Sequence, residues 1–139
     1  MSNLSGMHTT IISPESEIYS GSTYMVVLPG EEGDFAAMAD HAPIVTYLRK
    51  GKIEVINEEG NKKTIYFAGG GFVKVENNKC IIMVDYIKSL KNIDVEKNEI
   101  LIKKLQKKIE EEKDIITKRN LTDEIELLKS ENLIAQEKQ

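Results

Sequence analysis

The chain has 139 residues, a net charge of −4 and a hydrophobic content of 40%, which is enough for one ordinary domain with an appendage but not for two full cores. An acidic chain lacks the basic excess with which nucleic-acid-binding proteins neutralise phosphates, so no nucleic-acid partner is expected. No apolar run approaches the roughly 18 residues that span a bilayer, and residues 1–10 lack the pattern of a secretory signal. Direct membrane insertion is therefore not expected.

Residues 1–87 contain all the glycines, prolines and aromatic residues of the chain. Short apolar or alternating segments recur there between turn signals, at intervals of about 8 to 12 residues, which is typical of an antiparallel sandwich or barrel. The single cysteine, Cys80, lies in an apolar run and indicates a buried thiol in a reducing, cytoplasmic compartment. The expected strands are 24–28, 44–48, 52–56, 64–67, 72–76 and 80–84.

Residues 88–139 have no glycine, proline or aromatic residue, and their acidic and basic side chains balance. Asn92 or Asp94 is expected to cap a first helix, Ile115 and Ile116 are expected to extend its apolar face, and a break is expected at 118–120. Since neither glycine nor proline enforces that break, one long helix is the alternative to a hairpin. The two helices are predicted from apolar stripes at spacings of three and four residues, formed by Leu101, Ile102, Leu105 and Ile109, then Leu121, Ile125 and Leu128.

The chain has few residues with the chemistry of a catalytic or metal site. His8 and His41 are the only histidines, and no second cysteine or histidine stands at metal-ligand spacing. His41 is a candidate general base in a free-standing enzyme, but no nucleophile stands in a recognisable motif with it. The more common role of such a histidine is a bond to the backbone. We therefore predict no catalytic, metal or cofactor site and interpret the chain as an interaction module.

Two charged segments are candidates for docking on other proteins. The acidic turn after Pro29 is either a solvated turn or an exposed docking tip. A basic patch on the first predicted helix, Lys103-Lys104 and Lys107-Lys108, is either a solvated face or a strip that orients an acidic partner.

Several segments, in their order along the chain, resemble the epsilon subunit family of bacterial F-type (rotary) ATP synthases. The resemblance covers nearly the whole chain, and its most distinctive segments are Val-Leu-Pro-Gly at 27–30, Glu-Gly-Asp-Phe at 32–35, His-Ala-Pro-Ile at 41–44 and Ala-Gly-Gly-Gly-Phe-Val-Lys-Val at 68–75. It implies an α+β chain, with an N-terminal antiparallel β-sandwich over 1–87 and a C-terminal helical hairpin over 88–139. It also implies a non-catalytic central-stalk subunit that links the gamma subunit to the c-ring in proton-driven ATP synthesis. Such a subunit lies peripherally on the cytoplasmic face of the bacterial inner membrane.

The resemblance assigns residues to partners. The region that the family uses against the c-ring corresponds here to Glu31, Glu32, Gly33, Asp34 and His41. In an extended form the hairpin would insert between gamma and the alpha/beta catalytic subunits and block wasteful ATP hydrolysis. The side chains expected to dock it on beta and gamma are Lys103, Lys104, Lys107, Lys108, Lys118 and Arg119.

The sequence also departs from the family pattern. Ala-Ala-Met-Ala at 36–39 stands where the family commonly has Gly-Val-Leu-Pro, so the loop before His41 is expected to differ. Some members bind ATP through an Ile/Leu-Asp-x-x-Arg-Ala motif at the start of the first helix, but here Lys97 replaces the arginine and Asn98 the alanine. Since lysine cannot reproduce a bidentate guanidinium contact, ATP binding is not expected. A nucleotide-sensing variant of the same fold and a free-standing scaffold that dimerises through its helices are the alternative functions.

Overall fold

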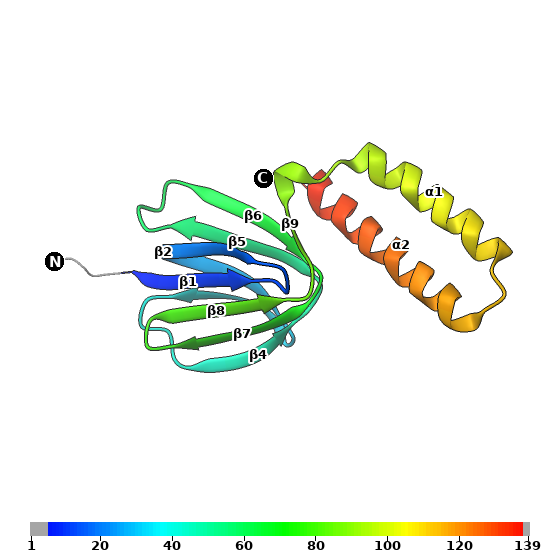
Figure 1. Ribbon diagram of the computed structural model, residues 1–139. Coiled ribbons are helices and arrows are strands. Elements are labelled where there is room, and N and C mark those ends of the chain that lie inside the picture. The colour runs from blue at the N-terminus through cyan, green and yellow to red at the C-terminus, as the bar shows by residue number, and fades with distance from the viewer. Residues whose placement is uncertain (1–5, 138–139) are drawn as a thin grey trace. The chain divides into compact units, whose positions relative to one another are not determined.

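The computed structural model describes residues 6–137, which form a strand-rich part followed by two helices (Figure 1). The chain divides between Ser89 and Leu90 into two compact units, here called the β unit and the helical unit. The boundary expected between residues 87 and 88 lies inside the strand β9 (Ile87–Ser89), because this strand pairs with an earlier strand of the β unit.

Two layers of strands make up the β unit. The strands before β9 are β1 (Met7–Ile12), β2 (Glu17–Gly30), β3 (Gly33–Met38), β4 (Ile44–Leu48), β5 (Gly51–Asn57), β6 (Lys63–Ala68), β7 (Gly71–Glu76) and β8 (Lys79–Val84). The long strand β2 contributes to both layers, because its first half pairs with β1 and its second half pairs with β3 and β5. Successive pairings give the order β2, β1, β8, β7, β4 in one layer and β3, β2, β5, β6, β9 in the other, and a single pair, Gly30 with Leu48, joins β4 back to β2.

The core of the β unit lies between these layers, where the inward side chains of alternating strand positions meet. Its fully buried members include Met7, Ile11, Leu28, Ile53 and Val73. The predicted β-sandwich followed by a helical hairpin is confirmed. One pairing differs from the expected antiparallel pattern, because β1 runs parallel to β8.

The strand β3 was not predicted from the sequence. Its residues 33–38 combine an acidic turn with small side chains, a composition that indicates a loop. In the structure Gly30 pairs with Gly33, so the chain reverses in a two-residue turn and β3 begins at once. The segment 36–39, where the sequence departs from the family pattern, therefore lies mostly in a strand.

The helical unit contains a short 3-10 turn η1 (Leu90–Asn92) and the helices α1 (Val95–Glu111) and α2 (Ile115–Gln136). Asp94, one of the two expected caps, caps α1 and accepts a hydrogen bond from the Lys97 backbone N–H at 3.1 Å. Within residues 6–137, neither helix is both long and apolar enough to cross a membrane.

The expected helix break at 118–120 is wrong, because the break lies at 112–114. The Glu112 carboxylate accepts hydrogen bonds from the backbone N–H groups of Lys113 (3.2 Å) and Asp114 (3.0 Å). Asp114 then caps α2 and accepts from the Thr117 backbone N–H at 2.9 Å. The carboxylate oxygens of Glu112 and Asp114 thus stabilise the turn between the helices, which contains neither glycine nor proline.

The predicted apolar stripes pack the two helices together. Ile102, Leu105, Ile125 and Leu128 are buried in one cluster, against which Ile109 and Leu121 pack. Ile115 and Ile116 do not extend the first stripe as expected: they open α2 and are 74% and 70% exposed. Leu101 is also exposed, because it lies beside the line of contact between the two helices, here called the seam, and not in it.

Candidate docking surfaces

The acidic turn, residues Glu31 to Asp34, closes the hairpin formed by β2 and β3. Glu31 and Glu32 are the two turn residues, and both are exposed. Gly33 has a φ of 137°, a conformation that residues with a Cβ rarely adopt, so a glycine follows the two glutamates. The sequence therefore places two adjacent carboxylates at the end of a tight hairpin.

Arg49, just after β4, fastens this hairpin to the rest of the β unit. Its Nε donates to the Gly30 carbonyl at 2.7 Å, and its Nη2 forms an ion pair with Asp34 Oδ1. Its backbone N–H donates to the Pro29 carbonyl at 2.8 Å, and the Glu31 N–H donates to the Tyr47 carbonyl at 2.9 Å. The backbone of the turn is thus held on both sides, and Arg49 offsets the charge of Asp34, leaving Glu31 and Glu32 as the acidic tip.

His41 lies in the loop between β3 and β4. Its Nδ1 donates to the Ala42 carbonyl at 2.7 Å, and its ring centroid lies 6.1 Å from that of Phe35. An open hollow of about 330 Å³ brings His41 together with the acidic turn, since its lining includes Glu32, Gly33, Asp34 and His41. Glu31, the remaining residue expected to face the c-ring, borders a second hollow with Val45, Tyr47 and Phe72.

An exposed apolar strip, which was not predicted from the sequence, crosses the outer face of β4, β7 and β8. The strip consists of Val45, Tyr47, Phe72 and Met83, and register pairs Tyr47 with Phe72 and Phe72 with Met83. These residues are between 39% and 68% exposed, with Tyr47 at 68% and Phe72 at 39%. A contiguous patch of large apolar side chains on a folded surface marks an interaction site.

A signal for this strip was present in the sequence. The segments 44–48, 72–76 and 80–84 have large apolar residues at both odd and even positions. In a strand with one solvated face, apolar and polar residues alternate instead. Leu48, Val73 and Val84 fill the core, so their apolar neighbours in sequence must lie on the opposite face. We predicted these three segments only as strands and expected no exposed apolar face on them.

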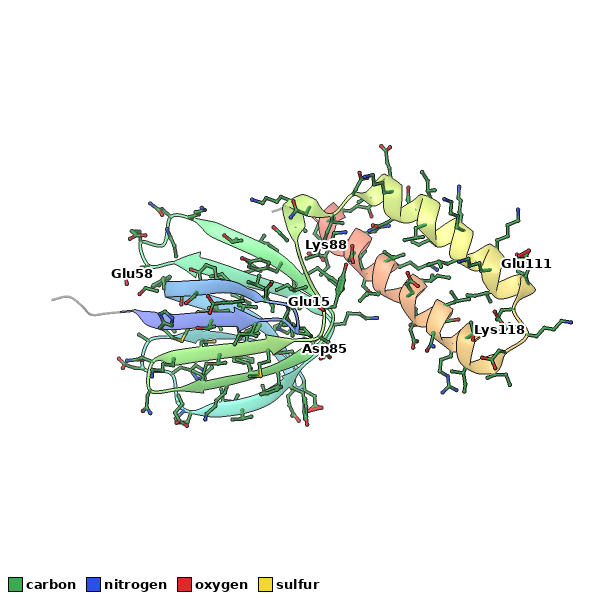
Figure 2. The ribbon with its side chains drawn as sticks, in the orientation of Figure 1. Glu15, Glu58, Asp85, Lys88, Glu111 and Lys118 are labelled. Carbon is green, nitrogen blue, oxygen red and sulfur yellow. The ribbon has the colours of Figure 1, made fainter. Side chains whose placement is uncertain are left out.

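The basic residues expected to dock the hairpin are all exposed, and they lie on both helices. Lys103, Lys104, Lys107 and Lys108 follow two turns of α1, whereas Lys118 and Arg119 lie on α2 beyond the interhelical turn. Glu111 and Lys118 flank that turn (Figure 2). The helical unit therefore presents cations along α1 and near its turn.

The residues at the ATP-motif positions have structural roles within the helical unit. Asp94 caps α1, and Lys97 is exposed. Asn98 is buried and faces α2, where its Nδ2 donates to Glu131 Oε1 at 3.2 Å and to Asn132 Oδ1 at 2.9 Å. The position where the motif has alanine thus carries an amide that links the two helices.

Known proteins resemble this chain in sequence. Residues 6–89 match the family model described as ATP synthase, Delta/Epsilon chain, beta-sandwich domain. The ATP synthase epsilon chain of Gluconacetobacter diazotrophicus is 38% identical over 86 residues, which cover 62% of this chain and 60% of that protein. The ATP synthase epsilon chain of Maricaulis maris is 37% identical over 91 residues, which cover 66% of this chain and 67% of that protein. The chain thus spans about three fifths of the length of the first of these relatives.

Solved structures resemble it in fold. A chain in the cryo-EM structure of Euglena gracilis mitochondrial ATP synthase, containing OSCP, F1 and the c-ring, superposes with a TM-score of 0.74 at 23% identity, over 93% of this chain and 81% of that chain. A chain in the central stalk and c-ring structure of Tetrahymena thermophila mitochondrial ATP synthase superposes with a TM-score of 0.54 at 20% identity, over 63% and 69% of the two chains.

Proposed function

The chain belongs to the ATP synthase delta/epsilon family, and we propose from this membership that it is the epsilon subunit of an F-type ATP synthase. In this role it links the gamma subunit to the c-ring within the central stalk during proton-driven ATP synthesis. The observation that carries the proposal is the match of residues 6–89 to the family's β-sandwich domain, because this unit bears both the acidic turn and the apolar strip. The subunit is non-catalytic and peripheral to the cytoplasmic face of the bacterial inner membrane.

The acidic turn and His41 form the surface for the c-ring. The turn is short, and Tyr47 and Arg49 form hydrogen bonds with three of its backbone groups, the Pro29 and Gly30 carbonyls and the Glu31 N–H. Because the turn is already held in place, little conformational entropy is lost when it docks. Glu31 and Glu32 present carboxylates to the polar and basic groups of the ring loops. Charged contacts of this kind set the orientation and rate of docking more than its affinity.

The apolar strip is the surface for gamma. Tyr, Phe and Met are enriched in the buried centres of protein interfaces, where a few aromatic side chains supply most of the binding free energy. Tyr47 and Phe72 are adjacent across the β4–β7 pair and together form the centre of the strip. Glu31 borders the same hollow, so the surfaces for the two partners adjoin each other.

The helical unit is the regulatory element. When the hairpin opens, its exposed lysines along α1, together with Lys118 and Arg119, meet acidic segments of the beta and gamma subunits and restrain ATP hydrolysis. The folded hairpin supports this role because, among residues 90–137, its apolar cluster has only four buried side chains. The packing that holds the two helices together is therefore small enough for a large partner surface to compete with it.

The test is ATP hydrolysis by the catalytic core stripped of this subunit, to which the full chain or a fragment ending at Ser89 is added back. The fragment retains the whole core of the β unit, and its cooperative thermal transition is checked first. We expect both to bind gamma, and only the full chain to slow hydrolysis. Binding of both without slower hydrolysis would leave a coupling role and remove the inhibition, and binding of neither would overturn the proposed function.

A further inference from the structure

The seam of the hairpin is built from layers in which one side chain of α1 meets one of α2. Along α1 the seam residues are Asn98, Ile102, Leu105 and Ile109, at spacings of four, three and four. Along α2 they are Leu121, Ile125, Leu128 and Asn132, also at spacings of four, three and four. These are the spacings of a coiled-coil seam, and all layers except the one with the two asparagines are apolar.

The asparagine layer is buried and bonded. Asn98 is 6% exposed and Asn132 is 8% exposed, and the Nδ2 of Asn98 donates to the side-chain oxygen of Asn132 at 2.9 Å. Glu131, also buried, accepts a second hydrogen bond from the same Nδ2 at 3.2 Å. Bonded amides are tolerated in a seam, but they contribute less to its stability than a pair of leucines, because they bury polar rather than apolar surface.

A polar layer in a coiled coil usually specifies the register of the helices. That explanation does not suffice here, because only residues 112–114 separate α1 from α2. The first of them, Glu112, is the C-cap of α1, and the last, Asp114, is the N-cap of α2. A turn this short already determines which residues of the two helices face each other. The remaining effect of the asparagine layer is to lower the free energy that holds the helices together.

The position of the layer makes this effect specific to opening. Asn98 lies in the first turn of α1 and Asn132 in the last turns of α2, so the layer is at the end of the hairpin farthest from the turn at 112–114. If the helices separate about that turn, this end moves first and farthest. Water replaces the lost hydrogen bonds of an exposed amide, whereas exposed leucines would have no such compensation.

We propose that Asn98 and Asn132 form a release layer that keeps the closed hairpin weak at its open end, so that the two helices separate readily when a partner competes for them. The proposal deepens the proposed function, because it names the residues that set how easily the regulatory helical unit opens. The weakness of the closed hairpin is, however, a property of the isolated chain and can be measured without any partner.

The test is native-state amide hydrogen exchange on the full chain and on the triple variant Asn98→Leu, Glu131→Leu, Asn132→Leu, which replaces all three buried polar side chains of the layer. We expect about tenfold slower exchange at the seam amides Ile102, Leu105 and Leu128, since replacing a complete buried polar network by well-packed apolar side chains is stabilising. The matched control, Asn120→Leu with Gln136→Leu, replaces two exposed amides of α2 and is expected to leave exchange at those amides unchanged.

Exchange that is unchanged or faster in the triple variant would overturn the proposal. To separate a folding defect from a true result, Asn98→Ala is measured as well, and we expect faster exchange because Glu131 and Asn132 lose their common donor. Exchange as slow in Asn98→Ala as in the full chain would also overturn the proposal. The triple variant is then added to the catalytic core: slower exchange without any loss of inhibition would support the release layer and count against the inhibitory part of the proposed function.

Discussion

Arg49 and Asp34 form an ion pair that joins the end of β4 to the start of β3. The same guanidinium donates to the Gly30 carbonyl on the other side of the acidic turn, so one side chain holds both ends of the turn. Because both partners are substantially exposed, at 48% and 72% of their side-chain surface, the pair positions the turn more than it stabilises the fold.

Removing this positioning is expected to weaken docking while leaving the fold intact. In Arg49→Ala we expect the free energy of unfolding to fall by no more than about 1 kcal/mol, the range of exposed ion pairs. The affinity for the c-ring is expected to fall about tenfold, because the loosened turn must then be ordered on binding. Urea unfolding and binding to detergent-solubilised c-ring measure the two quantities, and a large loss of stability with unchanged affinity would contradict the positioning role.

The carboxylates at the tip of the turn are expected to act through long-range charge. In Glu31→Gln with Glu32→Gln, we expect slower association with the c-ring and a weaker dependence of the association rate on salt. The matched control is Glu58→Gln with Glu59→Gln, an exposed acidic pair in the turn between β5 and β6. Figure 2 shows Glu58 at one end of the β unit and Asp85 at the other. The acidic turn lies at the Asp85 end, because Gly30 pairs with Leu48, Leu48 with Gly71, and Gly71 with Val84, the neighbour of Asp85. Equal effects of the two double variants would argue against docking through the acidic turn.

Part of this picture follows from the sequence. Period-two alternation in Lys52-Ile53-Glu54-Val55 and in Phe72-Val73-Lys74-Val75 predicted strands that the structure has, and the capping geometry of Asp94 was among the expected alternatives. Such features depend on the conformational preferences and polarity of residues that are neighbours in sequence, so a short segment is enough to predict them.

Other features depend on contacts that no short segment contains. The parallel pairing of β1 with β8 joins residues about 70 positions apart, and the strand β3 exists because its partner β2 supplies a ladder for small side chains. The interhelical turn was placed too late because Glu112 and Asp114 belong to a charged run that is itself compatible with a helix. The apolar strip, likewise, becomes visible only once three strands align Tyr47, Phe72 and Met83.

Gly71 is expected to tolerate no side chain. A Cβ at this position would lie 2.0 Å from the Met83 carbonyl oxygen, and the residue has a φ of 149°. We expect Gly71→Ala to lower the free energy of unfolding by more than about 3 kcal/mol, since backbone strain alone costs about 1–3 kcal/mol. Gly60→Ala is the matched control, because Gly60 also has a positive φ, 77°, but no atom lies within 4 Å of its Cβ; equal losses in the two variants would contradict the steric explanation.

The buried thiol of Cys80 is expected to make stability depend on alkaline pH. Burial raises the pKa of the Cys80 thiol from 9.0 to about 12, and its hydrogen bond with Thr9 lowers that pKa only in part. The folded state therefore keeps the proton between pH 9 and 12 while the unfolded state releases it, so this contribution to stability is complete below pH 9 and is lost as pH rises.

The difference in unfolding free energy between the full chain and Cys80→Ala isolates this contribution from other titrating groups. We expect that difference to shrink by about 1.4 kcal/mol between pH 8 and pH 10, as the unfolded thiol ionises. Urea unfolding at the two pH values measures it. A difference that stays constant with pH would mean that the thiol ionises equally in both states.

The most direct test of the central claim is the binding of the full chain to an F1 core from the same organism that lacks this subunit, measured by native mass spectrometry. We expect one copy of the chain per gamma subunit, and a loss of about 30-fold or more in affinity for each of the variants Tyr47→Ser and Phe72→Ser, since central aromatic residues contribute about 2 kcal/mol or more each. Lys62→Ser, at an exposed position in the turn between β5 and β6, is the control that should leave binding unchanged. Absence of binding by the unaltered chain, under conditions in which an ATP synthase epsilon chain from a relative binds its own core, would contradict the assignment of this protein to the central stalk.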